Sequence, residues 1–450
     1  PMSVKRLDRR QFLKSSALSA GAVSAGALAV PAIVPSRVLG KNAPSNTLQL
    51  GCIGTGRMGH GDMNACMSQG LASSAQARVV AVCDLDRLRA EHAKQEVDRF
   101  YRERLSDQPS PAVAVYEDYR ELLARDDIDG VTISTPDHWH ALNAVAAANA
   151  GKDIYLQKPL TYSIAEGQKL VAAVRRYNVV LQTGSQQRSD TNFRKACQLV
   201  RNGRLGKLHT IRVTLPTDRG TGDPITMKVP ANLNYEMWLG PTQSMPYTQD
   251  RVHPQEGFGR PGWLQIESYC RGMITGWGAH MFDTAQWGHG SDDTGPIEME
   301  ATGEFPDRGL FDVHTSFHAE GRYADGVRLI ATSGSPAGVR FEGDAGWIDV
   351  GRSHFKAEPG DVADQPIGKG ELRLYESNNH MLTFLECMRS RDNPICPVEV
   401  GHRSNSVCVI THIAMKLGRK LRWDPQAERF LVDESANALL DYEHRVPWKV

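Results

Sequence analysis

The most informative segment of this chain for its fold is Leu48-Gln49-Leu50-Gly51-Cys52-Ile53-Gly54-Thr55-Gly56-Arg57-Met58-Gly59. Its first half is a short apolar run that predicts a buried strand, and a segment with helical character follows its last glycine. Glycines with the spacing G-x-G-x-x-G between a strand and a helix are typical of a dinucleotide-binding turn. Gly54 permits the tight turn, Gly56 lets the backbone approach a pyrophosphate, and Gly59 lets the helix pack closely on the strand. The N–H groups at the start of that helix would then face the phosphates.

A second apolar run, residues 77–83, ends in Asp84. A carboxylate at the end of the second strand of such a fold accepts hydrogen bonds from the hydroxyls of the adenine ribose and repels a 2′-phosphate. Asp84 therefore predicts NAD as the cofactor, with NADP less favoured, and a solvated loop acid is the competing interpretation. Further strands at 130–135 and 153–156 alternate with helices, which predicts a parallel sheet with right-handed crossovers.

The two later strands run into segments that carry chemistry. Thr135-Pro136-Asp137-His138-Trp139-His140 ends the first of them, at the carboxyl edge where parallel sheets bind ligands. Gln157-Lys158-Pro159 follows the second. A lysine at such a strand end can polarise a substrate hydroxyl and help to move its proton, although most lysines are simply solvated.

A leader of different character precedes the first strand. Arg9-Arg10-Gln11-Phe12-Leu13-Lys14 is followed by a stretch, 15–34, made mostly of Ala, Ser, Gly, Val and Leu. Paired arginines before such a run are typical of an export signal of the twin-arginine route. A membrane anchor is disfavoured, because it needs about 20 strongly apolar residues, whereas Ser and Gly dilute this run and Pro31 and Pro35 end it. We predict a signal peptide over 1–35, a linker over 36–46, the twin-arginine translocase as partner, and a periplasmic or otherwise exported location.

The composition favours a small-molecule ligand. Fifty-two basic residues balance fifty-two acidic ones among 450, so the formal net charge is zero, and this gives no support to a nucleic-acid or anionic-membrane partner. The eight cysteines are scattered, with no close pair at metal-site spacing. We therefore expect no zinc site, and indeed no metal, and no disulfide framework.

Together the segments from Thr135 to Pro159 resemble the Gfo/Idh/MocA family, which comprises glucose–fructose oxidoreductase, inositol dehydrogenase and relatives. The resemblance covers essentially everything after the leader. It implies that Lys158 sits beside the nicotinamide and the reacting carbinol. The family motif is usually Glu-Lys-Pro, and here Gln157 replaces the glutamate. The cofactor contacts expected from the glycine turn and the resemblance are Gly54, Gly56, Arg57, Met58, Gly59, Asp84, Thr135, Pro136, His140, Gln157 and Lys158.

A second segment, 271–283, resembles the glycine-rich helix start that carries the family's catalytic histidine. By that match His280 is the general acid/base. An imidazole titrates near neutral pH and can take a hydroxyl proton, an effect worth about 10²–10⁴-fold in rate. Many members carry an aspartate four residues before this histidine, and here that position is Gly276. Something else must orient His280, or the chemistry has changed.

Four further residues are candidate substrate contacts. Gln187 and Arg188 follow the strand-like run 179–184 at the expected domain junction, where they can bind sugar hydroxyls or only the loop. Trp277 can stack on a sugar ring, although aromatic residues are more often part of a core. Asp283 lies on the same helix face as His280, and a helix cap or a salt bridge is an equal alternative for it.

The predicted fold class is α/β. An N-terminal Rossmann dinucleotide-binding domain spans 47–163, and a substrate-binding and oligomerisation domain of α+β type, with a large and mostly antiparallel sheet, spans 164–450. Strand-like runs in the second domain alternate apolar and polar residues, which indicates one covered face and one face free for packing against other subunits. We expect a homodimer or a homotetramer.

Three functions compete. The favoured one is an NAD(P)-dependent oxidoreductase that acts on a secondary alcohol of a sugar, glycoside or cyclitol, with a small carbohydrate as its partner. The alternative is an NAD-dependent glycoside hydrolase or lyase that oxidises its substrate transiently and enables elimination; it needs a further group to expel the leaving group. The third is a non-catalytic carbohydrate- or nucleotide-binding protein, which the presence of both Lys158 and His280 disfavours.

Overall fold

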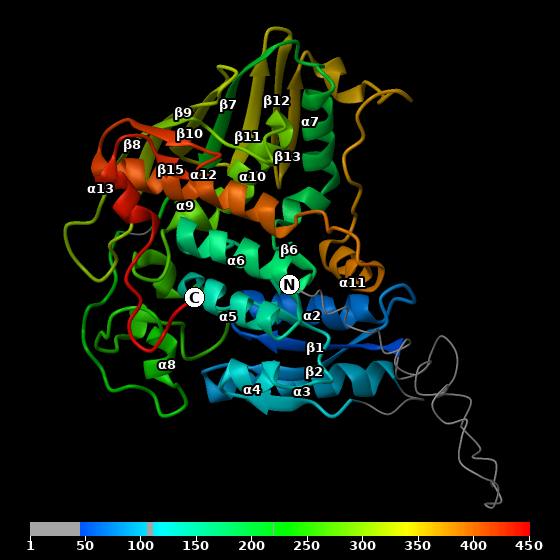
Figure 1. The fold of residues 1–450 in the computed structure, drawn as a ribbon, viewed down its shortest axis with the longest axis vertical. Coiled ribbons are helices and arrows are strands. Elements are labelled where there is room, and N and C mark those ends of the chain that lie inside the picture. Colours follow the sequence, from blue (N-terminus) through cyan, green and yellow to red (C-terminus); the bar gives the residue numbers. More distant parts are fainter. Residues whose placement is uncertain (1–45, 106–110, 219) are drawn as a thin grey trace, which may run out of the picture. The chain divides into compact units, whose positions relative to one another are not determined.

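The computed structural model describes residues 46–105, 111–218 and 220–450. The chain from Thr47 to Val450 forms one compact unit built on two sheets (Figure 1). The predicted signal peptide, the paired arginines and the predicted linker as far as residue 45 lie outside the described residues. Within the described ranges no helix has the length and apolar character needed to span a membrane.

The first sheet is the predicted Rossmann-type parallel sheet. In the described part its strand order is β3-β2-β1-β4-β5-β6, which is the doubly wound order with its reversal between β1 and β4. The strands are β1 (Leu48–Ile53), β2 (Ala77–Cys83), β3 (Ala114–Tyr116), β4 (Gly130–Ile133), β5 (Asp153–Leu156) and β6 (Leu181–Thr183). The helices that alternate with them are α2 (Arg57–Gly70), α3 (Arg87–Arg104), α4 (Tyr119–Leu123), α5 (Asp137–Asn149) and α6 (Ile164–Tyr177).

The parallel sheet extends beyond residue 163, where we predicted the first domain to end. Strand β6, which we assigned to the second domain, pairs with β5 through Ile154 with Leu181 and Leu156 with Thr183. Helix α6 is therefore the last crossover of the first sheet. It begins at a capping box, in which the side chains and backbone groups of Ser163 and Glu166 bond to each other. The cap therefore marks the start of a helix that connects two strands of the first sheet.

The second sheet is mostly antiparallel, as predicted. In the described part its order is β13-β12-β11-β7-β10-β9-β8-β14-β15, and only β7 and β10 pair in parallel. The strands are β7 (Leu208–Leu215), β8 (Glu298–Glu304), β9 (Ser316–Arg322), β10 (Arg328–Ser333), β11 (Gly338–Gly343), β12 (Gly346–Gly351), β13 (His354–Glu358), β14 (Leu421–Asp424) and β15 (Arg429–Phe430).

Strand β8 is an element that we did not predict, because its sequence is rich in glutamate. Met299 and Ala301 are buried while Glu298 and Glu300 are not, so the strand keeps the period-two alternation of a sheet with one wet face. The glutamates lie on the solvent face, where Glu298 pairs with Arg322 of the neighbouring strand β9.

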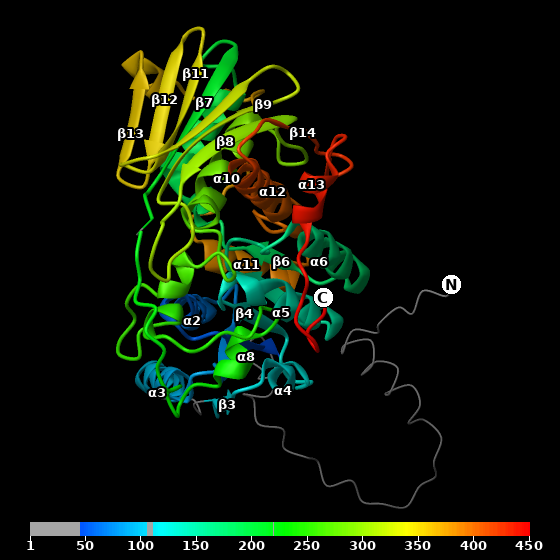
Figure 2. The same cartoon turned by 90° about the vertical axis from the view of Figure 1, so that its left-hand side faces the viewer.

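Helices cover the other face of this sheet, as Figures 1 and 2 show. They are α7 (Thr191–Arg201), α10 (Gly278–His289) and α12 (Val398–Leu417). Helix α12 contacts β8, α10 and α6, so it lies between the two sheet layers, and it is buried on nearly all sides. Helix α11 (His380–Ser390) packs against α2. Shorter helices are α8 (Tyr235–Leu239), α9 (Met273–Gly276) and α13 (Glu434–Asn437).

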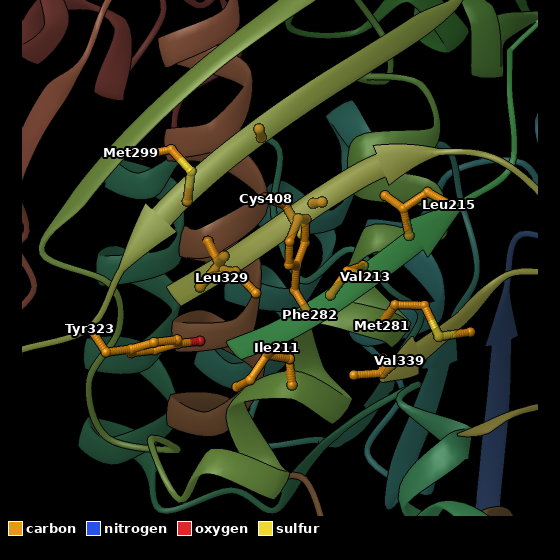
Figure 3. Packing of buried hydrophobic residues seen from close by; sticks show 14 of the residues in the cluster. Ile211, Val213, Leu215, Met281, Phe282, Met299, Tyr323, Leu329, Val339 and Cys408 are labelled. Carbon is orange, nitrogen blue, oxygen red and sulfur yellow. The ribbon is translucent and has the colours of Figure 1, made fainter. Parts of the chain in front are cut away.

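The core of the second sheet forms where α10 meets β7 and its neighbours. Phe282 of α10 is fully buried and points among Ile211 and Val213 of β7, Leu329 of β10 and Cys408 of α12 (Figure 3). This packing holds the start of α10, and with it His280, in a fixed position against the sheet.

We predict that Phe282→Ala lowers the free energy of unfolding by about 3–5 kcal/mol, because it removes a buried ring and leaves a cavity. Urea denaturation measures the effect. Phe305→Ala is the matched control, since Phe305 is 39% exposed and its loss should cost well under half as much. Equal costs for the two variants would contradict the assignment of Phe282 to the core.

Candidate active site

A deep cleft lies at the carboxyl ends of β1, β2, β4 and β5. It encloses about 1250 Å³ of empty space, open solvent at its mouth included, which is ample for an extended dinucleotide. Every cofactor contact predicted from the sequence lines this cleft except Gly59. Its opposite wall comes from the second half of the chain and includes Met237, Trp238, His253, Trp263, Leu264 and Gly276.

The glycine turn has the geometry that a bound pyrophosphate needs. Gly54 has φ +82°, and a β carbon there would lie 2.8 Å from the backbone carbonyl group of Ser134. A β carbon on Gly59 would lie 1.8 Å from the carbonyl oxygen of Gly54, so the close packing of α2 on β1 requires glycine. Gly56 precedes α2 and provides no side-chain cap. The first N–H groups of α2 are therefore left for an anion in the cleft.

The carboxylate of Asp84 is held in position by this turn. Its Oδ2 accepts hydrogen bonds from Thr55 N at 2.7 Å and Thr55 Oγ1 at 3.0 Å, and its Oδ1 accepts one from Asp86 N at 2.9 Å. A carboxylate has about four acceptor positions, so Asp84 keeps capacity for a ribose hydroxyl in the cleft.

Arg89 is a cleft residue that sequence reasoning missed. Its Nη2 donates to the carbonyl oxygens of Pro254 and Gly257 at 2.9 and 3.1 Å. Its Nη1 lies 3.2 Å from where a β carbon on Gly56 would be, so a cation stands beside the phosphate turn. The residue lies in a charged segment, 88–105, which gives no local sign that one arginine turns inward.

Gln157 and Asp62 form a buried pair that explains one departure from the family pattern. Gln157 Nε2 donates to Asp62 Oδ2 at 2.9 Å, and Ser134 Oγ donates to the same oxygen at 2.7 Å. Burial raises the pKa of Asp62 to about 6. A glutamate at 157 would place a second carboxylate against Asp62, and two like charges in a buried site repel strongly.

Lys158 lies where the two halves of the chain meet. Its Nζ donates to the carbonyl oxygen of Gly276 at 3.0 Å. The residue that replaces the family aspartate thus contacts the lysine through its backbone. Burial lowers the pKa of the Lys158 ammonium, and the nearby carboxylate of Asp137 opposes this shift.

His280 lies behind this contact and does not line the cleft itself. The imidazole is buried, and burial lowers its pKa well below the ordinary value, with the cations of Lys158 and Arg352 adding to the effect. The ring is therefore neutral at physiological pH.

Gln187 orients His280 and takes the place of the missing aspartate. Arg352 Nη2 and Nε lie 3.0 and 3.1 Å from the Gln187 amide. A guanidinium can only donate hydrogen bonds, so the amide oxygen faces Arg352 and the amide nitrogen donates to His280 Nδ1 at 2.7 Å. An Nδ1 that accepts leaves the imidazole proton on Nε2. Gln187 therefore acts on the histidine, and a direct contact of Gln187 with substrate stays a prediction.

Arg188 and Asp283, two of the predicted substrate contacts, bond to each other. The distance from Arg188 Nε to Asp283 Oδ2 is 2.8 Å, both side chains are buried, and neither lines the cleft. Asp292 and Ser404 complete the network at 2.7 Å each. A salt bridge was one of the alternatives that we considered for Asp283 from the sequence. It joins the 3-10 turn at Gln186–Ser189 to α10.

Trp277 is half-buried beside His280, with ring centroids 6.2 Å apart, and the Arg352 guanidinium lies 4.6 Å over its ring.

His140 lines the cleft, but its Nδ1 and Nε2 lie 2.6 and 2.9 Å from the carbonyl oxygens of Pro159 and Thr135. It therefore ties together the two segments that follow β4 and β5.

Asp137 is the second cleft residue that we missed. It begins α5, is buried, and lines the cleft together with Lys158. Its Oδ2 has no hydrogen-bond partner among the described residues. Burial raises its pKa to about 7, although the nearby Lys158 ammonium lowers it. An acid in the turn after a parallel strand was the available sign, and we gave it no weight beside the histidine and lysine.

Models of one protein family match both halves of the chain. The NAD-binding Rossmann fold of the oxidoreductase family matches residues 48–185, and the C-terminal alpha/beta domain of the same family matches residues 194–450. The chain belongs to the Gfo/Idh/MocA oxidoreductase family.

Curated relatives of this Gfo/Idh/MocA protein include sugar-active enzymes. Myo-inositol 2-dehydrogenase of Thermotoga maritima is 28% identical over 169 residues, which are 37% of this chain and 45% of that protein. A glycosyl hydrolase family 109 protein of Shewanella pealeana is 31% identical over 182 residues, 38% of each chain. The matched segments thus span less than half the length of these relatives.

Solved structures share the fold. Levoglucosan dehydrogenase in complex with NADH and levoglucosan has a TM-score of 0.60 at 17% identity and covers 84% of this chain and 99% of its own. The WlbA dehydrogenase of Bordetella pertussis, in complex with NADH and UDP-GlcNAcA, gives the same values. At this identity the likeness concerns the fold alone.

We predict that Gln157→Glu destabilises the protein by about 3–5 kcal/mol at pH 8, the cost of an uncompensated buried charge. The two carboxylates at 62 and 157 would share a proton in the folded state, which raises their pKa. A carboxyl group with a raised pKa in the folded state destabilises the protein as pH rises and the group ionises. The destabilisation caused by Gln157→Glu should therefore become smaller below pH 6, near the pKa of about 6 for Asp62.

The control is the exchanged pair, Asp62→Asn with Gln157→Glu, which keeps one carboxylate and one amide. Urea denaturation at pH 5 and pH 8 should find most of the stability restored in the double variant. A Gln157→Glu single variant as stable at pH 8 as the unmodified protein would show that the two side chains do not interact as described.

Proposed function

We propose that this protein is a nicotinamide-dependent oxidoreductase that acts on a secondary alcohol of a sugar, glycoside or cyclitol. The observation that carries the proposal is the position of Lys158. Its ammonium lines the same cleft as the glycine turn and bonds to Gly276, four residues before His280. An acid/base group is thus available at the end of a dinucleotide-shaped cleft, where a carbinol can be activated.

The residues present fit the cofactor. The N-terminus of α2 and Arg89 would hold the pyrophosphate, and Asp84 would accept the ribose hydroxyls. The Asp84 carboxylate would repel a 2′-phosphate, so we propose that the protein binds NAD more tightly than NADP. When bound, the nicotinamide supplies the acceptor for the electron pair that leaves the carbinol carbon.

Three residues of the chain have different roles in proton transfer. Lys158, whose pKa burial lowers, takes the hydroxyl proton. Asp137 compensates the charge on Lys158 as the proton arrives. His280 carries its proton on Nε2, because Gln187 donates to Nδ1, so it acts as a hydrogen-bond donor and not as the resting base.

A transient-oxidation glycoside hydrolase or lyase is the second candidate, and two observations favour keeping it. Relatives named glycosyl hydrolase family 109 proteins match this chain at 31% identity and above. Asp137 supplies what the sequence alone did not offer, a buried carboxyl group with a pKa of about 7 and an oxygen that has no hydrogen-bond partner among the described residues. A carboxyl group that is half protonated at neutral pH is suited to protonating a leaving group.

We predict that Lys158→Met lowers turnover by about 10²-fold or more, a loss typical of a missing acid/base group, and leaves the melting temperature unchanged or higher. In the unmodified enzyme kcat/KM should rise with pH as Lys158 loses its proton, below the usual lysine pKa of 10.5. This limb of the pH profile should vanish in the variant.

Lys420→Met is the control, since Lys420 is 56% exposed on a strand end away from the cleft, and its kinetics should be unchanged. A stable Lys158→Met variant with near-normal turnover would remove Lys158 from the mechanism.

We predict that sugar oxidation and cofactor reduction occur in equal amounts. The protein is incubated with NAD and a panel of free sugars and aryl glycosides, and the absorbance of reduced cofactor and the released aglycone are followed together. Aglycone released over many turnovers at trace NAD, without net reduced cofactor or oxidised sugar, would instead establish the hydrolase route. In that case Asp137→Asn should abolish release from glycosides with poor leaving groups first.

A further inference from the structure

A second group of ligating side chains lies outside the cleft, on adjoining faces of α2 and α3. His60 is in the first turn of α2, and His92 and Glu96 are one turn apart on α3. His60 Nδ1 lies 2.8 Å from Glu96 Oε2, and His92 Nε2 lies 3.7 Å from Glu96 Oε1. One ligand atom from each of the three lies within 4.8 Å of the other two. Because residues at i and i+4 share a helix face, the two helices present all three side chains to one point.

The atoms of this group do not satisfy one another by hydrogen bonding. Glu96 Oε2 is buried and has no hydrogen-bond partner among the described residues, although His60 Nδ1 is only 2.8 Å away. Two ligand atoms that lie this close without a hydrogen bond between them are both available to a cation. Around zinc, bonds of about 2.0–2.2 Å set neighbouring ligand atoms about 3.3 Å apart in a tetrahedral site, which falls between the two measured separations.

The surroundings hold the imidazoles in place and leave one side open. The ring of Phe258 lies 4.7 Å from the His60 ring and 5.6 Å from the His92 ring, so it covers both. His60 and His92 themselves are 30% and 49% exposed, which leaves room for water at the remaining coordination positions. Arg99 approaches Glu96 Oε1 at 3.6 Å, but its side chain is 65% exposed and free to move aside.

We propose that His60, His92 and Glu96 form a binding site for a divalent cation of the zinc class. Two imidazoles with one carboxylate suit Zn²⁺, Co²⁺ or Ni²⁺, whereas Mg²⁺ and Ca²⁺ prefer all-oxygen sites. The site goes against our expectation from the sequence that the chain binds no metal. It is independent of the proposed function.

The bound ion would stiffen the wall of the cofactor cleft. His60 follows Gly59 directly, so a ligand bond to His60 fixes the start of α2, whose N–H groups face the phosphates. The same ion joins α2 to α3, and Phe258 lies against Arg89, whose guanidinium is 5.3 Å from its ring. The ion thus connects the phosphate turn with the loop that Arg89 holds.

The test is zinc titration of the untagged protein by calorimetry, after chelator treatment and without nucleotide. We expect one Zn²⁺ per chain and a rise in melting temperature on adding it. His92→Ala and Glu96→Gln should each weaken zinc binding at least tenfold and abolish the rise, while keeping the melting temperature of the metal-free protein. Co²⁺ should give visible absorption bands of a low-coordinate site that both variants lose.

His318→Ala is the matched control. His318 also faces a carboxylate, Glu320, at 3.3 Å on an exposed surface, but it belongs to no group of three ligands among the described residues. Its loss should leave zinc affinity unchanged. The proposal fails if the unmodified protein binds no zinc below millimolar concentration, or if His92→Ala and Glu96→Gln bind it as tightly as the His318→Ala control.

Discussion

The hydrogen bond from the Lys158 ammonium to the Gly276 carbonyl oxygen joins the parallel sheet to the second half of the chain at the point where the cleft ends. A buried ammonium needs compensation, and a backbone carbonyl supplies a dipole but no charge. The negative charge is therefore provided from the first sheet, by Asp137 at the start of α5 and, further off, by Asp62. Lys158 is left with a lowered pKa, as a lysine that moves protons requires.

Two departures from the family pattern are each matched by a partner elsewhere in the chain. The amide of Gln157 avoids a clash of charges with Asp62, to which it donates. The glycine at 276 removes a carboxylate from beside His280, and Gln187, oriented by Arg352, then fixes the imidazole from its Nδ1 side. The site thus keeps its lysine and its histidine but sets their proton positions by different means.

The parts of this arrangement that local spacing determines could be predicted from the sequence. The glycine turn, Asp84 and the two strand ends are each a continuous segment whose period and residue types carry the information, and they lie together along one cleft. Several strands of the second sheet were predicted from alternation, but β8 was not, because glutamates on the solvent face concealed two buried positions, and neither were the short strands β13, β14 and β15.

The features that could not be predicted from the sequence are contacts between residues far apart in the chain. Arg188 and Asp283 are 95 residues apart and bond to each other. Gln187 and Arg352, which follows β12, are also far apart in the sequence and meet only in the folded chain. The His60, His92 and Glu96 group spans two helices, so no motif of adjacent residues marks it. The place of β6 in the first sheet could not be predicted, because β6 is a short strand whose position depends on its pairing with β5.

Calorimetric titration of NAD and NADP into the chelator-treated protein tests the central claim most directly, because the glycine turn, Asp84 and Lys158 have a joint purpose only if the cleft binds a nicotinamide dinucleotide. We expect one NAD to bind per chain, more tightly than NADP. The difference in affinity should be smaller in Asp84→Asn, which keeps an acceptor for Thr55 but loses the charge that repels a 2′-phosphate. Equal affinity for the two dinucleotides in the unmodified protein would contradict the role of Asp84, and the absence of binding to either would contradict the account as a whole.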